Sequence, residues 1–266
     1  TMMARFGFDA HYLKDGIKSW SGEMVKSTQD TIISGDSLWD SIKNDSNVFL
    51  LDVREPQEFA DFRIPGAVNI PLSQLFMPGS QSQLPKDKKI ITICSHGNRS
   101  MVATFALAQN GLESTSLVGG MSLWNQVLNA TTLKEDDATI IQVEKVGKGC
   151  LSHIIGSNGE AVVIDPTYPP KKYVEFAQKE GLKITKVIDT HQHADHVSAA
   201  KDLSQMTGAK LYLSKLEEYK LESQQMVDGD TISFGSKQLK AIHTPGHTPG
   251  SMSFVLNDKY VFSGDI

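Results

Sequence analysis

The chain has 266 residues, 39% of them apolar and 21% charged, a composition typical of a soluble globular protein and too apolar for intrinsic disorder. Its formal net charge of −5, without a cluster of Lys and Arg on one predicted face, argues against binding to nucleic acid or to an anionic membrane. We therefore expect its partners to be small molecules.

The N-terminus and the cysteines bear on the compartment. The first residues, TMMARFGFDA, lack the apolar core of a signal peptide, and no run approaches the roughly 20 apolar residues of a membrane span. Cys94 and Cys150 stand in unrelated contexts and predict no disulfide framework, as expected in a reducing compartment. These features predict a cytoplasmic protein without a membrane partner.

The N-terminal segment resembles a later part of the same chain. GFDAHYLKDGIKSW at residues 7–20 and GLESTSLVGGMSLW at residues 111–124 share Gly, Leu, Gly and Trp in the same register. An amphipathic helix could carry these residues by chance, but two of only three tryptophans at equivalent places favour an internal repeat. We interpret residues 1–24 as the remnant of a second module, with a strand-like start, a helix and no catalytic group.

From residue 31 onward, short β-branched runs alternate with helical segments. VFLLDV (48–53), IITIC (90–94) and STSLV (114–118) predict strands, and their alternation with helices predicts a parallel α/β sheet. The polar stretch NATTLKEDDA (129–138) then breaks this pattern and predicts a domain boundary.

Longer strands and two helices follow this boundary. TIIQVEK, CLSHIIG and EAVVIDP predict successive strands before a helix over 171–181. Next we expect a strand over 186–190, a helix over 197–207, a strand over 210–213 and a last group of strands separated by glycines.

A cysteine loop joins a predicted strand to a predicted helix. CSHGNRS follows IITIC and precedes MVATFALAQNG, so Cys94 lies at a helix N-terminus, where backbone N–H groups and the helix dipole favour an anion. Arg99 adds a positive charge, and His96 lies between the two. A buried structural cysteine is the alternative, but this surrounding favours a reactive thiol.

The segments LLDVREPQEFADFRIPGAVNIPL, CSHGNRS and GLESTSLVGGMSLW resemble a single-domain rhodanese over residues 31–130. On this resemblance Cys94 accepts a sulfane sulfur from thiosulfate or a thiol persulfide, with Arg99 and His96 near the donor. The resemblance also implies that Asp52 and Arg54 are structural, and that residues 1–24 are the tail of another rhodanese module. Ser95 stands where many rhodaneses have Arg, which weakens the expectation of thiosulfate as the preferred donor.

A dense group of possible metal ligands lies in the second half. DTHQHADHVSA (189–199) follows a predicted strand, and so many polar groups would crowd one another without a cation. TPGHTPGS adds His247 and FSGD adds Asp265, while His243 is expected to be a supporting residue. The motif at 189–199 itself contributes His191, His193, Asp195 and His196.

These motifs resemble the metallo-β-lactamase superfamily over residues 139–266, most closely its persulfide dioxygenases and glyoxalase II thioesterases. In the dioxygenase pattern, His191, His247 and Asp265 hold one Fe(II). Two His and one carboxylate leave adjacent positions open for a sulfur ligand and O₂. In the glyoxalase II pattern, two metals such as zinc are held, one by His191, His193 and His247 and the other by Asp195 and His196, with Asp265 bridging.

The family pattern continues past the GD motif, and this sequence does not. We therefore expect only the first part of an αβ/βα sandwich, with an exposed inner sheet face that a missing C-terminal half or another copy in a homo-oligomer would cover. The last histidine of the second metal site is also absent, so we expect His193, Asp195 and His196 to support one metal. Because Asp265 is the penultimate residue, weak iron binding is expected.

The predicted fold is thus α/β, with a rhodanese-like α/β/α parallel sheet followed by the first part of a metallo-β-lactamase αβ/βα sandwich. A domain that forms persulfides is a natural neighbour for one that oxidises glutathione persulfide to sulfite, which favours a sulfurtransferase joined to a persulfide dioxygenase. The alternatives are a glyoxalase II-like zinc thioesterase with an attached rhodanese, and a catalytically dead sulfur carrier.

Overall fold

The computed structural model describes residues 11, 14, 19, 21, 31–44, 47–135, 137–194 and 196–266. The chain divides into two units, Thr1–Thr31 and Ile32–Ile266. The segment 1–24, interpreted as a remnant, lies outside the described residues except for four single positions, so its repeat relationship stays a prediction. Within the described ranges, no helix is long and apolar enough to cross a membrane.

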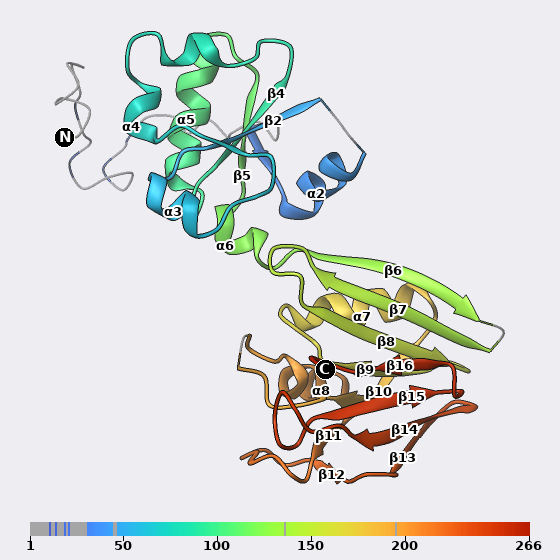
Figure 1. Ribbon diagram of the computed structural model, residues 1–266. Coiled ribbons are helices and arrows are strands. Elements are labelled where there is room, and N and C mark those ends of the chain that lie inside the picture. Colours follow the sequence, from blue (N-terminus) through green and yellow to red (C-terminus); the bar gives the residue numbers. More distant parts are fainter. Residues whose placement is uncertain are drawn as a thin grey trace. The chain divides into compact units, whose positions relative to one another are not determined.

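The first part of the larger unit is built on a five-stranded sheet in the order β1-β5-β4-β2-β3, in which every pair of neighbours is parallel (Figure 1). Its strands are β1 (Ile32–Ile33), β2 (Val48–Asp52), β3 (Val68–Asn69), β4 (Lys89–Ile93) and β5 (Ser114–Leu117). The α-helices of this part are α2 (Gly35–Lys43), α3 (Pro56–Asp61), α4 (Leu72–Leu75), α5 (Asn98–Gln109) and α6 (Gly120–Trp124), with a 3₁₀ turn η3 over Ser80–Gln83.

Two apolar clusters cover the two faces of this sheet. Leu50 and Ile91 lie in one cluster with Trp124, while their neighbours Leu51 and Ile90 lie in the other. Successive side chains of a strand point to opposite faces, so continuous apolar runs are what a parallel sheet with helices on both sides requires. The expected parallel α/β sheet is confirmed, with its strands where VFLLDV, IITIC and STSLV predict them.

The second part contains a seven-stranded sheet in the order β12-β11-β10-β9-β8-β7-β6 and a four-stranded antiparallel sheet in the order β13-β14-β15-β16. The first strands are β6 (Leu128–Glu135), β7 (Ala138–Lys145), β8 (Leu151–Ser157), β9 (Glu160–Ile164) and β10 (Lys183–Ile188). The others are β11 (Lys210–Ser214), β12 (Gln224–Met226), β13 (Thr231–Phe234), β14 (Lys237–His243), β15 (Met252–Leu256) and β16 (Tyr260–Phe262).

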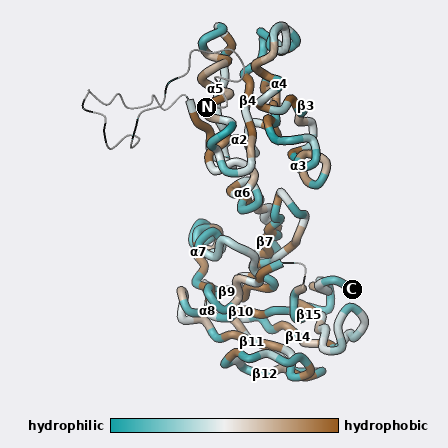
Figure 2. The backbone as a smooth tube through the Cα atoms, turned by 90° about the vertical axis from the view of Figure 1, so that its left-hand side faces the viewer, coloured by the Kyte–Doolittle hydropathy of each residue, from teal (hydrophilic) through white to brown (hydrophobic). Residues whose placement is uncertain are grey.

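Helices α7 (Pro170–Lys179) and α8 (Ala200–Thr207) cover one face of the seven-stranded sheet. Tyr173 and Leu203 are fully buried in the cluster between these helices and the sheet. Figure 2 shows β9 in the hydrophobic colour and α7 mostly in the hydrophilic colour, as expected for a helix that buries only one stripe.

The opposite face of the seven-stranded sheet packs on the four-stranded sheet. Ile155 and Val162 from one sheet meet Leu239 and Phe254 from the other in a single buried cluster. The expectation of an exposed inner sheet face is therefore wrong. The hairpins of β13 to β16 already form the second layer before the GD motif ends, and they cover the apolar side chains that alternate along β8 and β9.

The polar segment 129–138, which the sequence predicts as a domain boundary, contains strand β6 and the start of β7. Leu128–Glu135 forms strand β6 at the edge of the seven-stranded sheet and pairs with β7 along its whole length. Its polar composition is explained by its place, because an edge strand that faces solvent tolerates charged residues that a central strand does not.

Candidate functional site

The cysteine loop occupies the turn between β4 and α5. The Cys94 side chain is buried, and its Sγ accepts a hydrogen bond from the backbone N–H of Gly97 at 3.1 Å and contacts Ser100 Oγ at 3.4 Å. Gly97 is the N-cap of α5 with φ of 97°, a left-handed conformation that a residue with a side chain rarely adopts. The turn thus aims backbone donors at the sulfur.

These donors change the acidity of the thiol. Burial of Cys94 opposes ionisation and is the largest single influence, but the hydrogen bond with the Ser100 hydroxyl and those with the backbone of Ser100, His96 and Gly97 outweigh it. Together they hold the pKa of Cys94 below its ordinary value. A larger share of the side chain is therefore the nucleophilic thiolate.

Two glycines of the LVGGMSLW segment close the loop from the other side. Gly119 and Gly120 have φ of 64° and 54°, and a Cβ on Gly120 would lie 2.0 Å from the carbonyl oxygen of Cys94. This close approach lets the N–H of Met121 bond that carbonyl at 2.8 Å and the N–H of Ser122 bond the carbonyl of Ser95 at 3.0 Å. The GG pair is thus required by the packing of α6 against the cysteine loop.

The charged end of the loop is held by a residue that sequence reasoning missed. Glu58 of α3 accepts from both terminal nitrogens of Arg99, each at 2.7 Å, and from the Ser95 hydroxyl at 2.6 Å. The Arg99 guanidinium lowers the pKa of Glu58 to about 2. The signal that could have found Glu58 is its capping-box spacing behind Glu55, which fixes it in the first turn of α3.

The other residues expected near this loop are also placed. His96 is exposed on the loop between Cys94 and Arg99. Asp52 and Arg54 are buried and form an ion pair at 2.7 Å, and Arg54 also donates to the carbonyl of Phe62 at 2.6 Å. The positive charge of Arg54 and the negative charge of Asp52 therefore balance each other at the end of β2.

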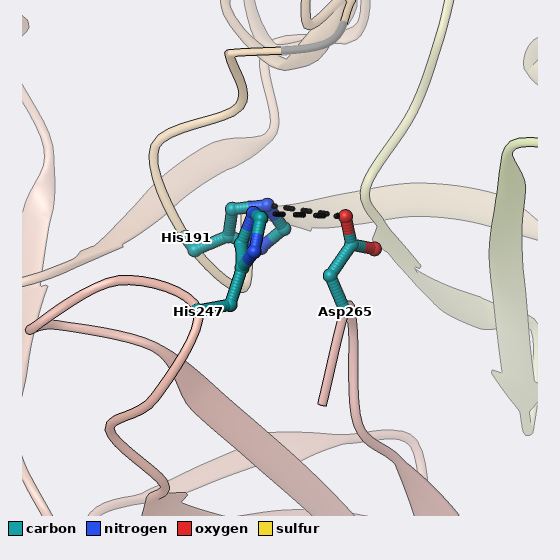
Figure 3. A group of neighbouring side chains, drawn as sticks. All are labelled: His191, His247 and Asp265. Atoms are coloured by element: carbon teal, nitrogen blue, oxygen red, sulfur yellow. Dashed lines mark ion pairs between the residues drawn. The ribbon is translucent and has the colours of Figure 1, made fainter.

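The second site brings together His191, His247 and Asp265 (Figure 3). His191 follows β10, His247 lies in the turn between β14 and β15, and Asp265 follows β16. The Nε2 atoms of both histidines lie 3.8 Å from Asp265 Oδ2. Ligand atoms bound to one ion are about 3 to 3.5 Å apart, so small side-chain rotations would close this set around a metal.

One buried nitrogen atom without a hydrogen-bond partner indicates that a metal fits this site. His191 Nε2 is buried and has no hydrogen-bond partner among the described residues. Thr190 Oγ1 donates to Asp165 Oδ2 at 2.8 Å, so it accepts from His191 Nδ1, also at 2.8 Å. The proton therefore sits on Nδ1, and the lone pair of Nε2 points toward Asp265. Burial lowers the pKa of His191, which favours the neutral, ligating form.

The remaining histidines of the motif surround this set. His193 Nε2 contacts Asp165 Oδ1 at 3.2 Å, and the rings of His193 and His196 are 4.3 Å apart between centroids. Asp165, Asp189 and His193 form a second group of potential ligand atoms, in which burial raises the pKa of Asp189 to about 7. Asp195 lies outside the described residues.

A cavity of about 400 Å³ adjoins the histidine cluster. Its lining includes His193, His196 and Asp265, together with Cys150 and Lys148. This volume lies in the range of small-ligand sites. A small molecule in this cavity would contact Asp265 of the ligand set.

Glu217 is the second residue that sequence reasoning missed. It accepts hydrogen bonds from the Thr248 hydroxyl and, at 3.1 Å, from the backbone N–H of Gly250, so it fixes the turn that presents His247. A Cβ on Gly250 would lie 2.6 Å from Glu217 Cγ, which explains why this turn position is glycine. His243 supports the same turn by contacting the carbonyl of Pro249 at 2.9 Å.

Glu217→Ala is expected to weaken metal binding by about 10- to 100-fold, because replacing a residue that orients a metal ligand typically lowers metal affinity by that factor. The measurement is a titration of the purified protein with Zn²⁺ or Fe²⁺ against a competing chelator. Glu218→Ala is the matched control, since it removes the neighbouring carboxylate, whose side chain is exposed. Equal affinities in the two variants would contradict a role of Glu217 in holding His247.

Two protein families match separate parts of the chain. The family described as "Rhodanese-like domain" matches residues 34–127, and the "Metallo-beta-lactamase superfamily" matches residues 146–266. The first match contains the cysteine loop and Glu58, and the second contains the histidine motif, the His247 turn and Asp265.

Several curated proteins are similar to part of the chain. "Persulfide dioxygenase ETHE1, mitochondrial" from Bos taurus is 37% identical over 109 residues, which is 40% of this chain and 42% of that protein. "Hydroxyacylglutathione hydrolase cytoplasmic" from Arabidopsis thaliana is 34% identical over 41% of this chain and 45% of that protein. "Probable polyketide biosynthesis zinc-dependent hydrolase BaeB" from Bacillus velezensis is 30% identical over 41% of this chain and 50% of that protein. The chain thus spans half or less of the length of these relatives.

Two solved structures are also similar to parts of the chain. A rhodanese-related protein from Thermoplasma volcanium has 39% identity and a TM-score of 0.32, covering 35% of this chain and 88% of that chain. ETHE1 from Myxococcus xanthus has 27% identity and a TM-score of 0.42, covering 51% of this chain and 56% of that chain.

Proposed function

Because this chain carries a rhodanese-like domain and a metallo-β-lactamase domain, we propose that it couples sulfur transfer at Cys94 to oxidation of a thiol persulfide at the His191, His247 and Asp265 site. The expected substrate is the persulfide of a low-molecular-weight thiol, with glutathione persulfide the first candidate and sulfite the product. The domain limits 31–130 and 139–266 belong to the same proposal, as does a cytoplasmic location.

The observation that carries the oxidation proposal is the composition of the ligand set. The ligand atoms of two imidazoles and one carboxylate lie within 4.8 Å of one another, and the buried Nε2 of His191 has no hydrogen-bond partner among the described residues. This is the donor set of non-haem ferrous oxygenases, in which the iron supplies adjacent open positions for a sulfur ligand and O₂. Thr190 and Asp165 hold the His191 ring, and Glu217 holds the turn of His247.

Sulfur transfer is supported by the geometry of the cysteine loop. The Cys94 thiolate attacks the outer sulfur of a persulfide R–S–SH, a new S–S bond forms on Cys94, and the bond between the two donor sulfurs breaks to release R–S⁻. The backbone N–H of Gly97 is placed to stabilise negative charge on the sulfur before and after this step.

A zinc-dependent thioesterase is the second candidate. It is favoured by the position of the proton on the His193 ring. Its Nε2 contacts the acceptor Asp165, which places the proton on Nε2 and the lone pair on Nδ1. His193 could then join His191 and His247 in a site with three histidines, as the resemblance to glyoxalase II implies. The identity to a hydroxyacylglutathione hydrolase agrees with this alternative.

The two candidates separate in one experiment on the purified protein loaded with Fe²⁺ or Zn²⁺. We expect oxygen consumption with glutathione persulfide in the iron form, with sulfite as the product, because only iron supports chemistry with O₂ at such a set. The assay uses an oxygen electrode on this chain and on any longer form that contains it, with thioester hydrolysis measured in parallel. Thioester hydrolysis with zinc and no oxygen uptake with iron would overturn the dioxygenase proposal.

A further inference from the structure

The one Arg of the cysteine loop is not free to face a sulfur donor. The sequence CSHGNRS contains Arg99 and no Lys. Both terminal nitrogens of Arg99 are bound in a two-pronged pair by Glu58, and Nη2 also donates to the Ser95 hydroxyl at 3.0 Å. A guanidinium in this arrangement has its charge balanced by a carboxylate at fixed distance.

Glu58 is itself held by several hydrogen-bond donors. Besides Arg99, its carboxylate accepts from the Ser95 hydroxyl and from the backbone N–H of Glu55 at 3.1 Å. Four donors from two elements thus fix one side chain at the N-terminal turn of α3. Release of Arg99 by rotation of Glu58 would leave several of these donors without their acceptor, so the balanced charge is a stable feature of the loop.

We infer that Glu58 is a specificity-determining residue. Its carboxylate balances the positive charge of Arg99, so the loop favours persulfides of small thiols over thiosulfate as sulfur donors. The inference rests on the sulfur transfer proposed above. Thiosulfate is a dianion, and its transfer to Cys94 releases the sulfite dianion. A persulfide carries at most one charge at its reacting end and releases R–S⁻. A loop whose cation is balanced offers no net attraction to thiosulfate, so the donor with more negative charge loses the advantage that an unbalanced cation would give it.

The test compares two donors in wild type, Glu58→Gln and Asp61→Asn, with thiocyanate formation from cyanide as the readout. Gln has nearly the size of Glu and keeps an acceptor for Ser95, but it leaves Arg99 unbalanced. We expect kcat/KM for thiosulfate, divided by that for glutathione persulfide, to rise about five- to tenfold in Glu58→Gln, the effect of one unit charge near the donor. Asp61→Asn removes one charge from the same helix and should leave the ratio unchanged, since Asp61 bonds Gln57 and not Arg99.

Three outcomes would overturn the inference. Equal losses with both donors in Glu58→Gln would mean that Glu58 only positions Arg99, and an unchanged ratio would mean that its charge is not felt by the donor. Absence of transfer from either donor in wild type would sink the proposed sulfur transfer together with this inference, whereas an active wild type with an unmoved ratio sinks the inference alone.

Salt dependence gives a second measurement that needs no variant. With a balanced loop, kcat/KM of the wild type for thiosulfate should change less than about twofold between about 20 mM and about 300 mM salt, because no net charge attracts the donor. A steep fall with added salt would reveal an unbalanced cation and would overturn the inference.

Discussion

Replacement of Cys94 by serine is expected to lower sulfur transfer by more than about a thousandfold, because a serine hydroxyl cannot ionise to a nucleophile near neutral pH as this thiol does. The loop would remain folded, since the Gly97 N–H and Ser100 hydroxyl that contact Sγ are also compatible with an oxygen of similar position. The measurement is thiocyanate formation from glutathione persulfide and cyanide. Intact mass after treatment with persulfide should show one added sulfur atom on wild type and none on the variant.

Cys150→Ser is the matched control for this result. Cys150 is the other cysteine of the chain and lines the cavity beside the histidine cluster, whose lining includes no residue of the Cys94 loop. Transfer should persist in the control. A Cys94→Ser variant that keeps its rate while the control loses it would show that the reactive thiol is Cys150 and that the cysteine loop has been misinterpreted.

The second large effect is expected at the histidine cluster. His191→Ala should lower bound metal from about one ion per chain to near zero, because the His191, His247 and Asp265 set would lose one of three ligands and could not be completed by Asp265 and His247 alone. Metal content after reconstitution with Fe²⁺ or Zn²⁺ and gel filtration, measured by elemental analysis, gives the stoichiometry without relying on activity.

Two further histidine variants make this result specific. His96→Ala removes an exposed histidine from the cysteine loop and should leave metal content unchanged. His193→Ala should retain a substantial part of the metal if the dioxygenase pattern holds, because His193 then only supports the site. Loss of metal in His193→Ala equal to that in His191→Ala would favour the three-histidine pattern of the thioesterase alternative. Full metal content in His191→Ala would contradict the proposed ligand set.

Much of the site was predictable because its chemistry is local in the sequence. The loop CSHGNRS places Cys94 and Arg99 between a β-branched run and a helix, and this order of elements alone fixes the sulfur near a helix N-terminus. The histidines at 191, 193 and 196 are close in the sequence, so a cluster was expected whatever the fold. The strands β2, β4 and β5 were predictable for the same reason, since their periodicity is read within a few residues.

The residues that sequence reasoning missed act through long-range contacts. Glu58 is 41 positions from Arg99, and Glu217 is 31 positions from Thr248, so neither spacing carries a pattern. Asp165 reaches Thr190 only because β9 and β10 are adjacent parallel strands whose carboxyl ends meet at one edge of the sheet. Which strands become neighbours is decided by the packing of whole layers.

The sequence by itself determined which side chains are candidates for the chemistry of this protein, because a thiol loop and a histidine motif are short and depend on local backbone order. Only the tertiary structure decided their state: the charge of Arg99 balanced by Glu58, the tautomer of His191 set by Thr190 and Asp165, and the inner sheet face covered by β13 to β16. These features depend on strand order and on pairs distant in the sequence, where burial and hydrogen bonding, and not local propensity, set the free energy.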